Sequence, residues 1–277
     1  MLNPIEFTAL DPKNIQASLS TKTFGRRLRI LPEVSSTNTY AQGLAESGNA
    51  HGTVIVAEQQ TAGRGRLNRT WFSPPGLNLY TSVILLPARS VRNMSWIPLI
   101  AGLALTETVH HVCGLKATLK WPNDILLNDK KFGGILCEGN SQGPSKQVVV
   151  VGIGLNVNMS ETDFPEDLHD QSTSLRIHTG TAVNRNTLLA QLLNALEAWY
   201  TRLTLGHLGP VREAYTAQCG TLNRELLVHL TNGEEFTAVG HAIGEDGSLH
   251  VSLQNAPDTP IRIIQSGEVT HMKIKHS

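Results

Sequence analysis

The strongest constraint on the fold is a change of pattern at Thr221, where mixed helical and strand-like segments give way to short strands alone. Before it, a helical stripe of apolar residues (186–203) and apolar β-rich runs such as 147–158 predict an α+β body. After it, short strands follow at close intervals and are joined by Asn-Gly and Asp-Gly turns, which are typical of hairpins. We therefore predict an α+β body over residues 31–220, a small SH3-like β-barrel over 221–277, and an irregular N-terminal extension over 1–30.

The elements expected in the body follow from apolar periodicity and from capping residues. Ser36 and Ser95 are the expected N-caps of two helices, and Gly48 and Gly114 their C-terminal stops. Two further helices are expected at 186–203 and 210–219, and strands at 53–58, 77–86, 117–128, 131–139 and 147–158. The polar segment 160–174 is expected to form a long loop.

Composition removes several classes of function. The chain of 277 residues has 23 Lys and Arg against 23 Asp and Glu, so it has no net charge to attract nucleic acid or an anionic membrane. Its three cysteines are widely spaced and fit a reducing cytoplasm rather than a disulfide scaffold. It shows no signal peptide and no apolar run of membrane-spanning length. Any anion site must therefore be local, and the expected location is the cytoplasm.

One such site is indicated by the stretch 58–74, EQQTAGRGRLNRTWFSP, which we call the arginine loop. It combines two glycines and three arginines with two aromatic residues: Gly63, Gly65, Arg64, Arg66, Arg69, Trp71 and Phe72. Backbone N–H groups around glycines bind anions, guanidiniums add two-bond phosphate contacts, and aromatic rings can stack on a heterocycle. The alternative is a solvated basic turn. The chain contains no P-loop motif GxxxxGK[ST].

Three further motifs have both a structural and a functional interpretation. Lys120-Trp121-Pro122-Asn123-Asp124 is either a plain turn or a site, and the second requires that it face the arginine loop. Lys131 precedes Gly133-Gly134 on a strand, where it is either a surface lysine or an ammonium brought close to a ligand. Gly152 and Gly154 lie on a buried strand without the third glycine and helix of a dinucleotide fold, so they make room for a ligand or a neighbouring chain.

A metal site is weakly indicated elsewhere. His110, His111 and Cys113 could ligate a metal, but adjacent histidines at the end of a helix are favoured by the helix dipole alone.

In this order and spacing, the motifs resemble those of the biotin–protein ligase family. The matching stretches are Ser36-Thr37-Asn38, Gln60 with GRGRLNRTWFSP, KWPND, KFGGILCE and GIGLNVN, followed by the β-rich tail. The resemblance covers about residues 33–277. It implies a catalytic domain related to class II aminoacyl-tRNA synthetases with an SH3-like C-terminal domain. It also implies that biotin and ATP give biotinyl-5′-AMP, from which the biotinyl group passes to a lysine of a biotin carboxyl carrier protein.

The resemblance also assigns roles to residues. Catalytic roles fall to Lys131, Arg64 and Arg66. The implied biotin-binding residues are Ser36, Thr37, Asn38, Gln60, Gly63, Arg64, Gly65, Arg66, Lys131, Gly134, Gly152 and Gly154. The implied ATP-binding residues are Arg66, Arg69, Trp71, Asn123, Asp124, Lys131 and Asn156, with Mg²⁺ on the phosphates and Asp124 as its candidate ligand. The segment 160–174 is a candidate second flap over the adenosine.

The sequence departs from the family pattern at Asn68, where many relatives carry glycine, and at Phe132, where a small aliphatic residue is more usual.

Two rival functions remain. A lipoate–protein ligase shares the fold and the adenylation chemistry but not this combination of motifs. A biotin-responsive transcriptional repressor needs a DNA-binding domain, for which about 30 residues before Ser36 are too few. The sequence leaves the oligomeric state open between monomer and homodimer.

Overall fold

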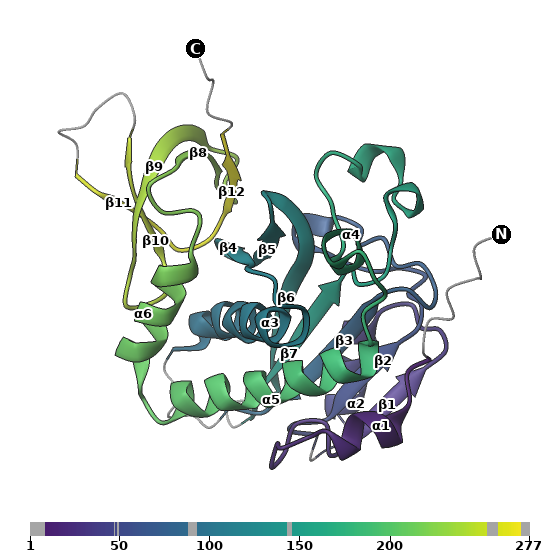
Figure 1. Ribbon diagram of the computed structural model, residues 1–277. Coiled ribbons are helices and arrows are strands. Elements are labelled where there is room, and N and C mark those ends of the chain that lie inside the picture. Colours follow the sequence, from purple (N-terminus) through teal and green to yellow (C-terminus); the bar gives the residue numbers. More distant parts are fainter. Residues whose placement is uncertain are drawn as a thin grey trace.

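The computed structural model of the protein describes residues 9–46, 48, 50–87, 93–142, 146–253 and 260–272 (Figure 1). The described residues form two sheets. The larger contains seven strands: β1 (Leu28–Leu31), β2 (Val54–Ala57), β3 (Leu79–Leu85), β4 (Thr118–Lys120), β5 (Asp124–Leu127), β6 (Lys130–Gln142) and β7 (Lys146–Leu155). Their order is β1-β2-β3-β7-β6-β5-β4; β1 pairs parallel with β2, and the other pairs are antiparallel. The expected strands of the body are confirmed, and the sheet is mixed.

Helices cover both faces of this sheet (Figure 1). On one face α3 (Ile97–Cys113) packs against α5 (Arg185–Thr204), and their leucine-rich stripes share the main core with β3, β6 and β7. On the other face α2 (Thr37–Glu46) buries Ala41 and Ala45 against Ile55, Ile84 and Val150. Gly114 ends α3 in the left-handed conformation, as expected.

Two expectations are wrong. Residues 9–31 contain α1 (Pro12–Ala17) and strand β1, and Ile15 and Phe24 are buried in the main core, so this part is not irregular. Ser95 does not cap α3: it lies in a 3₁₀ turn (Met94–Trp96), and its hydroxyl donates to the carbonyl of Asp246 in the C-terminal part. Ser95 therefore ties the start of α3 to the second sheet.

The second sheet follows α6 (Leu208–Gln218) and is wholly antiparallel, as predicted for a small β-barrel. Its strands are β8 (Glu225–His229), β9 (Glu235–Ile243), β10 (Leu249–Leu253), β11 (Arg262–Ile264) and β12 (Glu268–His271), in the order β11-β10-β9-β8-β12. The Lys120–Asp124 turn attaches it to the body. The Trp121 backbone N–H donates to Thr221 Oγ1 at 3.0 Å, and the Trp121 indole donates to the Gly247 carbonyl at 3.0 Å.

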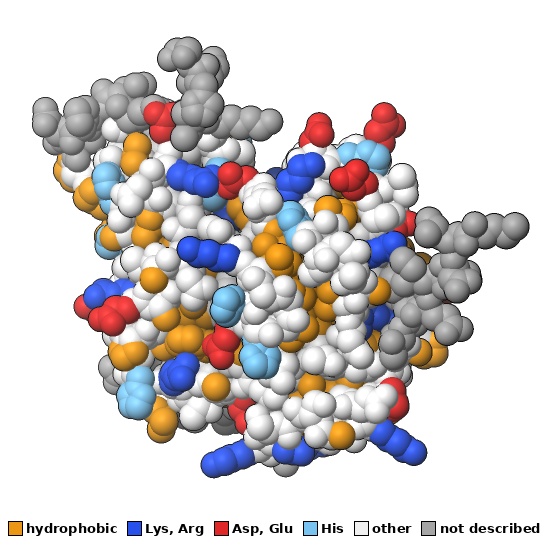
Figure 2. Space-filling model, viewed as in Figure 1, with side chains coloured by type: hydrophobic (Ala, Val, Ile, Leu, Met, Phe, Trp, Pro, Cys, Tyr) orange, Lys and Arg blue, Asp and Glu red, His pale blue; other side chains and the backbone are white. Residues whose placement is uncertain are grey.

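The segment 160–174 contains two short 3₁₀ turns (Glu161–Asp163 and Glu166–Leu168) and leads into α4 (Leu175–Thr179). It lies beside the start of β6, because the Lys131 N–H donates to Gln171 O at 2.8 Å and the Thr173 N–H donates to Lys131 O at 2.9 Å. Figure 2 shows a notch at the top of the molecule between this segment and the C-terminal sheet, with basic and acidic side chains alternating along its rim.

Candidate active site

The arginine loop leaves the buried strand β2 and folds back on itself. The Gly65 N–H donates to Arg69 O at 2.7 Å, and the Trp71 N–H donates to Gly63 O at 3.0 Å. Leu67 and Asn68 at its tip have left-handed backbone angles, with φ of 51° and 59°. Asparagine tolerates this conformation better than most residues, so Asn68 keeps a geometry that suits glycine.

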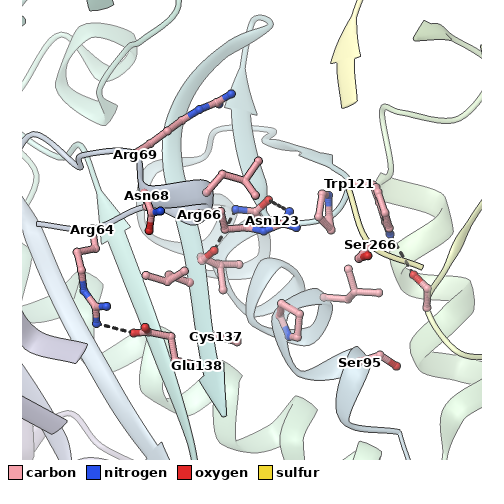
Figure 3. Close-up of a pocket in the computed structure, with 18 of the residues that line it drawn as sticks. Arg64, Arg66, Asn68, Arg69, Ser95, Trp121, Asn123, Cys137, Glu138 and Ser266 are labelled. Atoms are coloured by element: carbon pink, nitrogen blue, oxygen red, sulfur yellow. Dashed lines mark hydrogen bonds and ion pairs between the residues drawn. The ribbon is translucent and has the colours of Figure 1, made fainter. Parts of the chain in front are cut away.

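Each arginine of the loop has an acceptor on a different element. Arg64 Nη2 lies 2.8 Å from Glu138 Oε2 on β6, and Arg66 Nη1 donates to Asn123 Oδ1 at 3.0 Å (Figure 3). Arg69 points away from the other two and pairs with Glu268 of β12. The loop is therefore held at three places, and the Lys120–Asp124 turn faces it as a functional interpretation of that turn requires.

Arg66 is the arginine whose acceptor is neutral. Asn123 is fixed to β6, since its Nδ2 donates to Ile135 O at 3.0 Å and its carbonyl accepts from the Ile135 N–H at 2.9 Å. Burial lowers the pKa of Arg66, and the charges of Glu268 and Asp124 act in the opposite direction. A guanidinium in this setting favours an anion beside it, because the anion would offset the loss of water.

Lys131 projects from the start of β6 toward the same place. Its Nζ lies 2.5 Å from Asp124 Oδ1 and 5.4 Å from the centre of the Trp71 ring. Asp124 also receives Lys120 at 3.5 Å. Asp124 thus orients two ammonium groups, and Lys131 is partly buried rather than a free surface lysine.

The glycines of β6 and β7 make room for side chains that lie flat on the sheet. A Cβ at Gly134 or Gly154 would come within 2.9 Å or 2.6 Å of the Trp71 ring, and one at Gly152 would collide with the amide of Asn38. Trp71 Nε1 is buried and has no hydrogen-bond partner among the described residues. An unpaired buried donor costs free energy, so this N–H is available to a ligand acceptor.

The Ser36-Thr37-Asn38 stretch at the start of α2 is bonded to Gln60 and to the sheet. The Thr37 N–H donates to Gln60 Oε1 at 2.9 Å, and Gln60 Nε2 donates to Ser73 Oγ at 3.0 Å. The fully buried Ser82 hydroxyl lies 2.8 Å from Thr37 Oγ1 and 2.6 Å from Asn38 Oδ1. Ser82 and Glu138 were not singled out in the sequence, because nothing local distinguishes them.

Two adjoining cavities bring the candidate residues together. The smaller, of about 50 Å³, lies over the glycines of the sheet. The larger, of about 1060 Å³, extends from the arginine loop past the Lys120–Asp124 turn to the C-terminal sheet (Figure 3). Arg64, Gly65, Arg66 and Asn123 line both. Because 50 Å³ holds only about one or two waters, a larger ligand over the glycines requires Trp71 or the arginine loop to move.

Of the residues expected to bind biotin or ATP, Asp124 and Asn156 line neither cavity. Asn156 is buried, its Nδ2 donates to Thr173 O at 3.1 Å, and its N–H donates to Phe132 O at 2.7 Å. It connects the end of β7, the start of β6 and the segment 160–174, and so holds in place the backbone on both sides of Lys131. Phe132 is fully buried in the main core.

No group of three His, Cys, Asp or Glu side chains among the described residues could hold a metal ion. The carboxylate of Asp124 already faces two ammonium groups, which would repel Mg²⁺. His110 and His111 end α3, as the helix-dipole interpretation expects.

No helix in the described part of the chain is long and apolar enough to cross a membrane.

Comparison with known proteins shows which family this chain resembles. Residues 30–156 match the Biotin/lipoate A/B protein ligase family. The bifunctional ligase/repressor BirA of Bacillus subtilis is 34% identical over 240 residues, which cover 86% of this chain and 72% of that protein. The biotin–[acetyl-CoA-carboxylase] ligase of Mycobacterium tuberculosis is 30% identical over 271 residues, covering 95% and 96%.

Among solved structures, a biotin protein ligase from Aquifex aeolicus in complex with biotin and ATP superposes with a TM-score of 0.75 at 29% identity. The superposition covers 88% of this chain and 98% of the Aquifex aeolicus chain. The expected combination of a class II synthetase-like body with a small SH3-like domain is confirmed.

Proposed function

The chain belongs to the Biotin/lipoate A/B protein ligase family, and from that premise we propose that it is a biotin–protein ligase. In the first step the carboxylate of biotin attacks the α-phosphate of ATP, giving biotinyl-5′-AMP and pyrophosphate. In the second step the ε-amine of a lysine on a biotin carboxyl carrier protein attacks the mixed anhydride and releases AMP. The observation that carries this proposal is that Arg64, Arg66 and Lys131 all line the smaller cavity over the glycines of the sheet, which we call the hollow.

The first step joins two anions, so its barrier is lowered mainly by fixed positive charge. Arg66 and Lys131 both line the hollow, one from the arginine loop and one from β6. Both have acceptors on the Lys120–Asp124 turn, which holds their charged ends in place before substrate arrives. Preorganised charges of this kind stabilise a phosphoryl-transfer transition state without reorganisation at the moment of reaction.

Biotin recognition is assigned to the polar network around Ser36, Thr37, Asn38 and Gln60. This network lines the hollow and would offer hydroxyl and amide groups to the ureido ring. The hydrocarbon part of biotin would lie over Gly152 and Gly154, where a side chain would block it. Trp71 must leave part of this space, and its ring and free N–H are then available to the adenine.

Mg²⁺ is proposed only as a companion of the ATP phosphates. The described side chains supply no carboxylate cluster for it, and Asp124 is better explained as the group that orients Lys131. Toward ATP, Arg69 would act directly from the lining of the larger cavity, whereas Asn156 would act through its neighbours.

The larger cavity provides access for the acceptor. It opens between the arginine loop and the C-terminal sheet and has room for a lysine side chain on a turn of the carrier. We assign the chemistry to residues 31–220 and the support of the arginine loop to 221–277. Biotin, ATP and the carrier meet in the cytoplasm, which is the proposed location, and the enzyme acts as a monomer or homodimer without binding specific nucleic acid.

The test is transfer to a defined acceptor. The protein, ATP and biotin are incubated with a biotin carboxyl carrier domain, and the mass of the domain is measured. One biotinyl group is expected on the acceptor lysine and none on a carrier in which that lysine is arginine. Lipoate is run in parallel with its own carrier domain. Faster transfer of lipoate than of biotin would replace this proposal with the lipoate–protein ligase alternative.

A further inference from the structure

Glu138 is the one acidic side chain that lines the larger cavity from the sheet, and two functional groups converge on the same oxygen atom. Arg64 Nη2 and Asn38 Nδ2 both lie 2.8 Å from Glu138 Oε2. The donors come from different elements, the arginine loop and α2, and they are 74 and 100 residues distant from Glu138 in the sequence. A single carboxylate therefore joins the loop to the start of α2.

The contact to Asn38 is the fixed part of this arrangement. Asn38 is buried, its Nδ2 also donates to Leu136 O at 3.1 Å, and its Oδ1 lies 2.6 Å from the Ser82 hydroxyl. Its amide rests on Gly152, where a Cβ would collide with it. Asn38 therefore has little freedom to move away from Glu138.

The contact to Arg64 is the adjustable part. The Arg64 side chain is 42% exposed, and it extends from a glycine-flanked loop position. Arg64 lines both cavities, whereas Glu138 lines only the larger one. A ligand carboxylate in the hollow over the glycines would compete with Glu138 for the same guanidinium.

The other two arginines of the loop differ in this respect. Arg66 donates to a neutral amide, and the carboxylate that holds Arg69 belongs to Glu268, which lines neither cavity. Among the three, Arg64 is thus the one paired with an anion that faces the cavity system.

We propose that Glu138 is a positioning residue that occupies Arg64 while no anionic ligand is bound and yields it to the carboxylate of biotin. The inference rests on the proposed function, because it takes biotin as the ligand. The pair holds the arginine loop over the site before substrate enters. Biotin must then displace Glu138 from Arg64. Its binding therefore gains only the difference in free energy between the two carboxylate–guanidinium interactions.

The exchange predicts that the Glu138 charge weakens the binding of an anionic ligand but not that of a neutral ligand with the same ring system. Partly exposed ion pairs contribute little, so removing the competing charge is expected to raise affinity for an anion about two- to fivefold. Glu138→Gln is the matched variant, because its amide oxygen still accepts from Asn38 while its charge is gone. Biotinamide is the matched ligand, because it keeps the ring system and replaces the carboxylate with a neutral amide.

The experiment measures the dissociation constants of biotin and biotinamide by calorimetry in the wild type, Glu138→Gln, Arg64→Gln and the double variant. The ratio of the biotinamide constant to the biotin constant is expected to rise about two- to fivefold in Glu138→Gln. The rise should be absent when the same change is made in the Arg64→Gln background. Glu138→Asp, which shortens the reach to Arg64, is a second variant and should change the ratio in the same direction.

Three results overturn the inference: equal weakening of both ligands, no change in either constant, or a rise that persists without Arg64. The first would mean that Glu138 only holds Asn38. Failure of the proposed function is distinguishable, because the wild type itself would then not bind biotin.

Discussion

Arg69 and Glu268 lie 199 residues apart in the sequence and form a two-bond ion pair, with each Nη 2.6 Å from a carboxylate oxygen. The pair connects the arginine loop to the last described strand of the C-terminal sheet. Two parallel N–H···O bonds fix orientation as well as distance. The C-terminal sheet therefore helps to position a loop that carries the charges of the active site.

Glu268→Gln should loosen the loop without unfolding the protein. Arg69 is 67% exposed, so the loss of stability should stay below about 1 kcal/mol. Trypsin is expected to cleave after Arg64 and Arg66 faster in this variant than in the wild type, and mass spectrometry measures the rate. Glu234→Gln, which breaks the Arg262–Glu234 pair within the C-terminal sheet, is the control. Equal cleavage rates in all three proteins would show that the Arg69–Glu268 pair does not restrain the loop.

Arg185 should be far more important for stability. Its side chain is 2% exposed and pairs with Glu58 at 2.6 Å, at the point where β2 leads into the arginine loop. Removing one partner of a buried pair leaves an uncompensated charge, so Arg185→Ala should lower the free energy of unfolding by about 3–5 kcal/mol. Urea unfolding measures this, with Arg262→Ala as the exposed control. A loss of less than 1 kcal/mol for Arg185→Ala would contradict the account.

His271 should make the protein sensitive to acid. It lies against Thr221, and burial, aided by the charges of Lys120 and Arg224, lowers its pKa to about 4 from the ordinary 6.5. The unfolded chain then binds more protons than the folded one between these values, so stability falls as pH drops from 6.5 to 4. His271→Gln should lose less stability over that window, by on the order of 2 kcal/mol after allowance for partial exposure. Urea unfolding at pH 7 and pH 4 tests this; parallel losses in both proteins would exclude His271 as the cause.

Arg66→Gly should separate the two half-reactions. The change removes the hydrogen bond to Asn123 and adds backbone freedom to the loop, so biotinyl-5′-AMP should form and then escape. Blotting a lysine-rich bystander protein for biotin should show heavy labelling. Arg262→Gly is the control, since it also breaks an arginine–carboxylate pair but lies outside the arginine loop and lines neither cavity. Adenylate synthesis without bystander labelling would mean that Arg66 does not retain the intermediate.

The sequence was most informative where function demands particular residue types close together in the chain. Gly63 to Trp71, the Lys120–Asp124 turn and Lys131 could be singled out because loops that bind anions need glycine and basic residues side by side. That these motifs meet also followed from the resemblance to a known family. Six of the seven strands of the body, β2 to β7, were visible as apolar runs, because a buried strand needs apolar residues close together in the chain.

The contacts that hold the site together could not be predicted in this way. Glu138 and Glu268 are ordinary acidic residues of strands, and their importance comes from partners 74 and 199 residues away. Helix α1 and strand β1 were missed because each is too short for a period to show, and their burial depends on contacts with α5 and β2. Trp71 was recognised as a stacking group, but its position on Gly134 and Gly154 depends on the folded sheet.

The central claim is that this site activates biotin through fixed positive charge, and ATP–pyrophosphate exchange tests it most directly. Isotope from labelled pyrophosphate should enter ATP when biotin is present and should not do so with lipoate. Lys131→Ala should slow exchange by roughly 10²–10³-fold, the loss typical of one such transition-state contact, while biotin still binds. Exchange that depends on lipoate instead of biotin, or that proceeds at the wild-type rate without Lys131, would contradict the account.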